Sequence, residues 1–331
     1  LQERYKMKRY IFRLLLVSIP VVILITIISF TFIELAPGDA VSAMVMQSSS
    51  SSLGNISKDQ LERLREMHGF NNPAYIRYIL WLKNMATGNF GYRFKDRKPV
   101  STLLSERIPM TLELMAVSLL VACFIGISLG IISALKQNTL IDYVLTVIAF
   151  GGVSVPIFFI AMLAIFVFSL NLDWFPTSGA RTPAVPFTII DHLHHLFLPS
   201  LVMAFVIMSD IMRYARASML EVIKEDYITT ARAKGLSGLQ LIMGHAFRNA
   251  LLPLITIIAL KLPWIFGGAS ILETVFQWPG LGSLFVEAAI ARDYYIIMAQ
   301  LVVYGVAVLA AGLLADIAYA VADPRIRYHS N

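Results

Sequence analysis

The longest polar stretch in the C-terminal half of this chain, residues 221–253, carries the residues best suited to binding a protein partner. It lies between two apolar runs, and its cations and histidine are Lys224, Arg232, Lys234, His245 and Arg248. A loop this basic between two membrane spans is expected on the cytoplasmic side. The alternative is a juxtamembrane loop whose basic residues only set the orientation of the spans.

Two short helices separated by a turn are predicted within this polar stretch. Residues 227–234 can form the first helix, Gly235-Leu-Ser-Gly238 ends it, and residues 239–251 can form the second, before Pro253. Gly235 would permit the turn and a close approach of a partner backbone. Two helices tied rigidly to the flanking spans suit docking of a soluble protein.

One charged residue, Lys261, lies inside an apolar run. A lysine at that depth costs about 3 kcal/mol on insertion scales, so it is expected to face a polar cavity or a partner. We expect Lys261 to line a translocation path and to attract an anionic group, such as a peptide carboxylate. The alternatives are that it reaches the interface or pairs with a partner's carboxylate. Asp210 and Arg213, three residues apart, are predicted to pair on one helix face.

Two glycine pairs near prolines predict bent or broken helices. Pro156 follows Gly151-Gly152, and Pro263 precedes Gly267-Gly268. Broken helices line the transport sites of many carriers, so Pro156, Pro263 and Gly267 join Lys261 as candidate path residues. Close helix packing through glycine is an equally good interpretation and is compatible with the first.

Three histidines, in the sequence Asp191-His-Leu-His-His195, could in principle hold a transition metal. His192 and His195 project differently from His194 in either an extended or a helical chain. We therefore expect His192, His194 and His195 to be interfacial side chains, and no metal site is predicted.

The chain carries no recognisable catalytic motif. It has no G-x-x-x-x-G-K-[ST] phosphate loop, no G-x-S-x-G and no H-E-x-x-H. We therefore predict that it is not an enzyme by itself and binds no cofactor, and that ATP-driven transport would need an ATPase on another chain. An ion-coupled carrier would need mid-span carboxylates and usually an internal repeat, and neither is clear. An intramembrane enzyme is the third, least supported class.

The composition is that of an all-α polytopic membrane protein. Of 331 residues, 57% are hydrophobic and 15% charged, and the mean hydropathy is +0.71. Soluble domains carry about a quarter charged residues. The net charge of +6 suits cytoplasmic loops and anionic lipid. Six predicted spans cover residues 14–35, 109–134, 143–170, 196–219, 254–274 and 295–321.

The segments between the spans complete the predicted organisation. Residues 1–13 form a basic arm, within which residues 1–6 are read as non-native or an upstream extension because Met7 could be the start. Residues 36–108 form a long extracytoplasmic loop with two amphipathic helices, at 57–69 and 73–83. Residues 109–322 form the transmembrane core, including the polar stretch, and 323–331 a tail. Basic residues gather in the arm, the polar stretch and the tail, which places both termini in the cytoplasm.

Several motifs in this order resemble the peptide (dipeptide/oligopeptide/nickel) permeases of binding-protein-dependent ABC transporters. They are LAPGD at 35–39, DYITTARAKGLS at 226–237, HAFRNALLP at 245–253, ETVFQWPGLG at 273–282, ARDY at 291–294 and DPRIRY at 323–328. The resemblance implies a type I ABC importer permease fold in a bacterial or archaeal cell membrane. It also implies that 221–253 is the coupling loop that enters a groove of an ATPase subunit.

The same resemblance implies partners, a substrate class and coupling residues. The partners would be a second homologous permease, two ATPase subunits that bind ATP and Mg, and an extracytoplasmic substrate-binding protein. Peptides are the implied substrate, with nickel or an oligosaccharide as alternatives; no nucleic acid is implied. Arg232, Lys234 and Arg248 would pair with acidic groove residues, or else contact lipid headgroups. The full candidate coupling set is Tyr227, Thr230, Ala231, Arg232, Ala233, Lys234, Gly235, Leu236, His245, Arg248 and Asn249.

Overall fold

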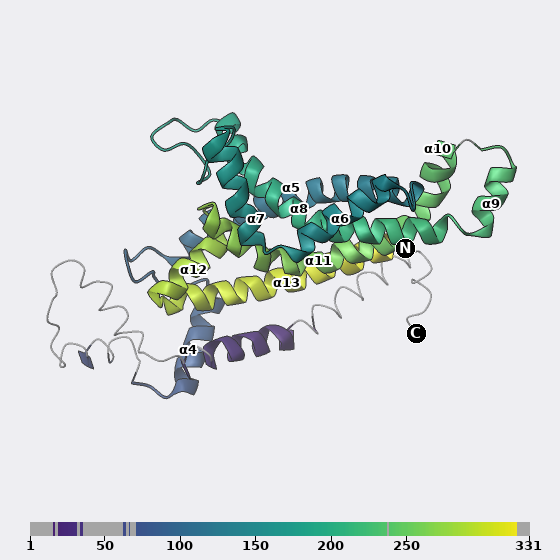
Figure 1. Ribbon diagram of the computed structural model, residues 1–331. Helices are drawn as coiled ribbons and strands as arrows, with labels where there is room; N and C mark the ends of the chain where they lie inside the picture. Colours follow the sequence, from purple (N-terminus) through teal and green to yellow (C-terminus); the bar gives the residue numbers. More distant parts are fainter. Residues whose placement is uncertain are drawn as a thin grey trace. The chain divides into compact units, whose positions relative to one another are not determined.

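Helices make up the regular secondary structure throughout the described part of this computed structural model (Figure 1). The structure describes residues 16, 19–31, 34–35, 62–63, 66, 71–236 and 238–322. An isolated bridge between Tyr92 and Pro99 is the β pairing found there. The basic arm, the predicted helix at 57–69 and the tail at 323–331 lie outside the described residues, apart from single positions.

Most of the described helices follow the apolar runs of the sequence, whereas the helices Asp226–Ala233 and Gly238–Gln240 lie in the polar stretch 221–253. In chain order they are Ile19–Thr31, α4 (Ala74–Ala86), α5 (Val100–Leu135), α6 (Leu140–Ser154), α7 (Ile157–Ala164), the π-helical η1 (Ile165–Asn171), α8 (Ile189–Val222), α9 (Asp226–Ala233), α10 (Gly238–Gln240), η2 (Leu241–Ala246), α11 (Phe247–Val275), α12 (Leu281–Ala291) and α13 (Tyr294–Ala322). Helices α5 and α8 begin before their predicted spans, so part of what was expected to be loop is helical.

Three of the described helices are long and apolar enough to cross a membrane, and they lie within α5, α8 and α13. The pair formed by α6 with α7–η1 makes a fourth if a bent pair counts as one span. The apolar helix Ile19–Thr31 is shorter. The count of six spans stays a prediction.

The chain divides into two compact units, which are described separately. The first consists of Leu1–Met110 and Gly280–Leu309. Its core joins the first turns of α5 to α12 and the start of α13 through Val100, Leu103, Leu104, Leu281, Leu284, Ala288, Ile296 and Ala299. Helix α4 covers the predicted amphipathic helix at 73–83 and packs on Ile19–Thr31, where Thr26 and Tyr78 hydroxyls lie 2.9 Å apart.

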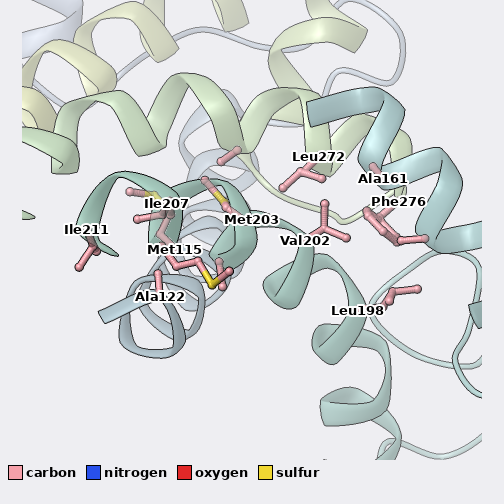
Figure 2. Close-up of a cluster of buried hydrophobic side chains, with 14 residues drawn as sticks. Met115, Ala122, Ala161, Leu198, Val202, Met203, Ile207, Ile211, Leu272 and Phe276 are labelled. Carbon is pink, nitrogen blue, oxygen red and sulfur yellow. The ribbon is translucent and has the colours of Figure 1, made fainter. Parts of the chain in front are cut away.

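The second unit, Thr111–Pro279 with Ala310–Asn331, is organised around α8. Helix α8 packs against α6, α7 and α11. Its Met203, Ile207 and Ile211 are buried in a core that also takes side chains from α5, α7 and α11 (Figure 2). A helix that is buried on most of its faces is the central helix of a bundle.

Small residues let α5 approach α8 closely. Ala122, Gly126, Gly130 and Ala134 recur every four residues on α5 and are buried. A Cβ added at Gly130 would lie 2.5 Å from Cβ of Ala215 and 2.7 Å from the carbonyl oxygen of Met212. Stripes of small residues at this spacing bring membrane helices into backbone contact. Helices α5 and α8 therefore interlock in this region.

The glycine–proline pairs had different outcomes. The prediction at Pro156 is confirmed, because the chain between α6 and α7 turns by 107° with Val155 extended. The predicted interruption at Pro263 and Gly267-Gly268 is wrong, since α11 runs as one helix from Phe247 to Val275. A proline in a membrane helix removes a single donor, and neighbouring helices hold the rest of the ladder in place.

Candidate functional site

The first half of the polar stretch 221–253 is a short helix ending in a glycine turn. Helix α9 (Asp226–Ala233) begins and ends one residue before the predicted helix. Gly235 then has φ +82°, a left-handed conformation that glycine adopts without steric cost. No atom lies within 4 Å of an added Cβ there. The backbone angle, rather than lack of space, therefore calls for glycine.

The second half of the stretch is continuous with a long helix. Helix α10 passes into η2, and η2 into α11 without a break. The second predicted helix was expected to end at residue 251, before Pro253, and this boundary is wrong because α11 continues beyond it. This half of the stretch and α11 therefore form one continuous helical segment.

An apolar cluster packs against the buried sides of α9 and η2. Ile228 and Ala231 of α9 and Leu241 and Ala246 of η2 pack with Ala134, Met219 and Ala250. A cavity of about 340 Å³ remains among them, lined by Leu135, Ile223, Ile228, Leu236, Gly238, Leu241, Ile242 and Ala246. The side chain of Asn249 also donates a 2.8 Å hydrogen bond to the Tyr227 hydroxyl, which ties α9 to α11.

Most of the candidate coupling residues lie on the outside of this supported stretch. Exposed members are Tyr227, Thr230, Ala233, Lys234, Gly235, Leu236, Arg248 and Asn249. Ala231 differs, because it is buried in the supporting cluster. The side chains of Arg232 and His245 lie outside what the structure describes. We call the exposed residues of 224–236 together with Arg248 and Asn249 the coupling surface.

An ion pair between a buried carboxylate and a partly exposed arginine lies beside this stretch. Asp142, in the first turn of α6, is 2% exposed. Its Oδ1 accepts hydrogen bonds from Arg216 Nε at 2.8 Å and from Ser133 Oγ at 2.5 Å. Its Oδ2 accepts from Arg216 Nη2 at 2.8 Å and from the backbone N–H of Asn138 at 3.0 Å. We call these four residues the clamp; it joins α5, the α5–α6 turn, α6 and α8.

Lys261, the middle residue of α11, forms an ion pair with Asp210 of α8. Asp210 also pairs with Arg213, so the predicted intrahelical pair is confirmed. The guanidinium of Arg213 lies 5.7 Å from the centre of the Phe150 ring. Lys261 therefore pairs with a carboxylate of its own chain, whereas the alternative stated from the sequence was a carboxylate of a partner. Its place on the translocation path stays a prediction.

The three histidines are in the first two turns of α8 and have separate structural contacts. His192 Nδ1 lies 2.9 Å from the Ala180 carbonyl oxygen and its Nε2 lies 2.9 Å from Glu113 Oε2. His194 Nε2 contacts the carbonyl oxygen of Trp174, and His195 Nδ1 that of Asp191. Among the described residues no group of three or more His, Cys, Asp or Glu could hold a metal ion.

In the first unit, the aspartate of the ARDY motif fastens a loop to a helix start. Asp293, 1% exposed, precedes α13, and its Oδ2 accepts a 2.7 Å hydrogen bond from the backbone N–H of Phe94. Burial raises the pKa of Asp293 above its ordinary value. Phe94 packs on Tyr294 and Tyr295. The residue 87–99 loop is thus held against the start of α13.

Comparison with known families decides what kind of protein carries these features. Residues 126–328 match the family described as binding-protein-dependent transport system inner membrane component. Residues 7–115 match the family for the N-terminal part of such membrane components. This chain belongs to that family. It is a permease, and the resemblance drawn from the motifs is confirmed.

Individual relatives agree along nearly the whole permease. It is 44% identical over 323 residues to the oligopeptide transport system permease protein AppB of Bacillus subtilis (strain 168), covering 97% of this chain and 100% of AppB. It is 33% identical over 322 residues to the glutathione transport system permease protein GsiC of Escherichia coli (strain K12), covering 97% and 100%. The MetNI methionine ABC transporter, solved in inward-facing conformations, has a similar fold, with TM-score 0.52 and 16% identity over 67% of this chain and 96% of that one.

The sequence did not reveal two pairings in the permease. Asp142 and Arg216 are 74 positions apart, and Asp210 and Lys261 are 51 apart. One signal was available: each is a charged residue in or beside an apolar run, where an unpaired charge is costly. That signal predicts that a partner exists, but it does not say which residue the partner is.

Proposed function

We propose that this permease forms half of the translocation pore of an ATP-driven importer of peptides. The observation that carries the proposal is the 44% identity with an oligopeptide transport permease over that relative's whole length. A dipeptide transport permease of Alkalihalophilus pseudofirmus, DppB, is 35% identical over all of its own length. These relatives favour peptides over nickel or oligosaccharides as the transported substrate.

The coupling surface is where an ATPase subunit would dock. Its exposed side chains rest on the apolar cluster under α9 and η2. The surface follows α8 after a short turn and is continuous with α11. A partner that moved this surface would therefore move two long helices with it, as rigid-body coupling requires.

The remaining parts of the proposal concern topology and partners. Six spans with both termini in the cytoplasm of a bacterial or archaeal cell would put residues 36–108 outside the membrane and the coupling surface inside. A second homologous permease would complete the pore. Two ATPase subunits would bind ATP and Mg, and a substrate-binding protein would deliver the peptide from outside.

Uptake by the complete complex tests the substrate class. We would reconstitute the permease with its partner permease, ATPases and binding protein in proteoliposomes and offer labelled dipeptides, longer peptides and Ni²⁺ separately. The expected result is peptide uptake that requires ATP. Nickel uptake without peptide uptake would refute the peptide assignment, and uptake without any ATPase would refute the importer assignment.

A bulky substitution tests the docking site. Ala233 is exposed at the end of α9, so tryptophan there should not disturb folding but should obstruct a docked partner. We expect Ala233→Trp to lose retention of the ATPase during purification of the complex. Lys83→Trp, at an exposed position of α4, is the matched control and should retain it. Equal retention by both variants would show that the ATPase binds elsewhere.

A further inference from the structure

We propose that Asp142 and Arg216 are positioning residues that make the α5–α6 turn and α6 follow α8 when the coupling surface moves. The proposal rests on the docking function proposed above. It assigns the clamp a mechanical role in transport: the clamp passes movement of the coupling surface to helices that the ATPase does not touch.

The clamp holds its parts in one geometry. The two oxygens of Asp142 accept four hydrogen bonds of 2.5 to 3.0 Å between them. Two of these come from the planar fork of Arg216, a bidentate arrangement that fixes direction as well as distance. Asn138, which supplies the backbone donor, has φ +62° in the tight turn between α5 and α6. The turn is thereby folded back onto α8.

Stability alone does not account for a pair like this. An ion pair with a buried member usually contributes no more than well-packed apolar side chains of similar volume, because the buried charge, here that of Asp142, must leave water. What the pair supplies is a specific arrangement, because the buried carboxylate of Asp142 would be costly to leave without its cation. That property fits an element whose task is to keep three helix ends in register.

The packing around the clamp leaves little room for sliding. Arg216 directly follows Ala215, the residue against which Gly130 of α5 packs. On α6, a Cβ added at Gly152 would lie 2.1 Å from Oγ of Ser209 and 3.0 Å from the carbonyl oxygen of Phe205. Helices α5 and α6 are thus both in backbone contact with α8. The clamp joins the C-terminal end of α5 and the first turn of α6 to α8, and so connects the α5–α8 contact to the α6–α8 contact.

The same helix ends support the coupling surface. Ala134 follows Ser133 of the clamp, and Met219 lies one turn after Arg216. Both residues pack with Ile228 and Ala231 of α9 in the apolar cluster. A displacement of α9 therefore acts on α5 and α8 close to the clamp. Through Asp142, it also reaches α6 and the 107° bend that leads to α7.

The decisive variant replaces both charges. Asp142→Asn with Arg216→Gln removes the ion pair without leaving a buried charge unpaired, so the protein should still fold. We would purify the full complex and measure peptide uptake and ATP hydrolysis in the same proteoliposomes. We expect hydrolysis to persist while the peptides imported per ATP fall about fivefold or more, the range of typical coupling between sites.

A conservative variant and a control complete the test. Arg216→Lys keeps the charge but loses the fork and should give an intermediate ratio. Asp96→Asn breaks an exposed ion pair with Arg93 in the other unit and should leave the ratio unchanged. If the double variant does not assemble, Arg216→Lys decides: a lowered ratio supports the clamp.

Two results would overturn the inference. One is an unchanged number of peptides per ATP in the double variant or, where that is not assembled, in Arg216→Lys. The other is a parallel loss of hydrolysis and uptake with a constant ratio, as expected of a purely structural pair. Absence of ATP-dependent peptide uptake by the unaltered complex would instead refute the proposed function, and the clamp's role in it.

Discussion

The turn between the two halves of the coupling surface depends on one backbone angle. Gly235 has φ +82°, whereas Gly244 lies in η2, and neither has an atom within 4 Å of an added Cβ. We expect Gly235→Ala to destabilise the turn by about 1 kcal/mol and to lower ATP-dependent uptake, while Gly244→Ala has no such effect. Thermal unfolding and uptake measure this. Equal behaviour of the two variants would mean that the left-handed turn is dispensable.

Two aspartates of the first unit should respond oppositely to pH. Burial raises the pKa of Asp293, so its folded state binds protons more strongly, and its contribution to stability falls as pH rises from the unfolded pKa of about 4 through the folded pKa. The hydrogen bond from Arg93 lowers the pKa of Asp96 to about 2, so its contribution is present above about 4 and lost as pH falls toward 2.

The measurement is the melting temperature of each Asn variant relative to the unaltered permease. From pH 4 to 7, we expect the melting temperature of Asp293→Asn to rise relative to that of the unaltered protein as pH rises. From pH 2 to 4, the melting temperature of Asp96→Asn should fall relative to that of the unaltered protein as pH rises. If the difference in melting temperature between Asp293→Asn and the unaltered protein did not change with pH, burial would not raise the pKa of this carboxyl.

Lys261 remains a candidate for the translocation path, now with a known partner. Lys261→Met leaves Asp210 paired with Arg213, so the fold should survive. We expect the variant to reduce the uptake rate of peptides with a free terminal carboxylate more than that of C-terminally amidated analogues, at saturating binding protein. Lys83→Met is the exposed control. An unchanged preference would remove Lys261 from the path.

At the scale of elements, the closeness of α6 and α8 is tested by two adjacent glycines. A Cβ at Gly152 would meet Ser209 and Phe205, whereas a Cβ at Gly151 meets nothing within 4 Å. Gly152→Ala should therefore destabilise the permease by about 1–3 kcal/mol through overpacking. Gly151→Ala should be neutral or stabilising, because alanine favours helix. Thermal unfolding of both variants measures this, and the reverse order would contradict the packing.

Sequence patterns predicted helices better than helix breaks. The glycine–proline pattern near residue 151 precedes a bend, while a similar pattern near residue 263 lies inside the continuous helix α11. The two patterns contain the same residue types in opposite order, with the glycines before Pro156 but after Pro263. At Pro156 the preceding residue, Val155, is extended, the conformation favoured before a proline. Helix α11, which packs on α8 and α7, stays helical through Pro263.

At the scale of the whole molecule, the proposed topology places the residue 87–99 loop and the coupling surface on opposite sides of the membrane. In a Cys123→Ser background, single cysteines at the exposed positions Lys95 and Lys234 can report this. We expect an impermeant thiol reagent to label Lys95→Cys in intact cells and Lys234→Cys only in inverted vesicles. Labelling of both from one side would exclude the six-span topology.

The sequence by itself determined the class of protein and the position of the turn at Gly235. Long apolar runs need helices because backbone polar groups have no water to bind in a membrane. Gly235 and the polar residues around it marked a turn between helices, because local conformation depends on nearby residues. The family motifs likewise lie in fixed order along the chain.

Only the tertiary structure decided which charges pair and which helices are rigidly joined. Asp142 finds Arg216, and Lys261 finds Asp210, across distances in sequence that no local pattern spans. Gly130 and Gly152 are required because each lies against α8, where there is no room for a larger side chain. Pairing energies in a low-dielectric interior depend on three-dimensional separation. The sequence could therefore predict that these charged residues need partners, but only the tertiary structure shows which residues the partners are.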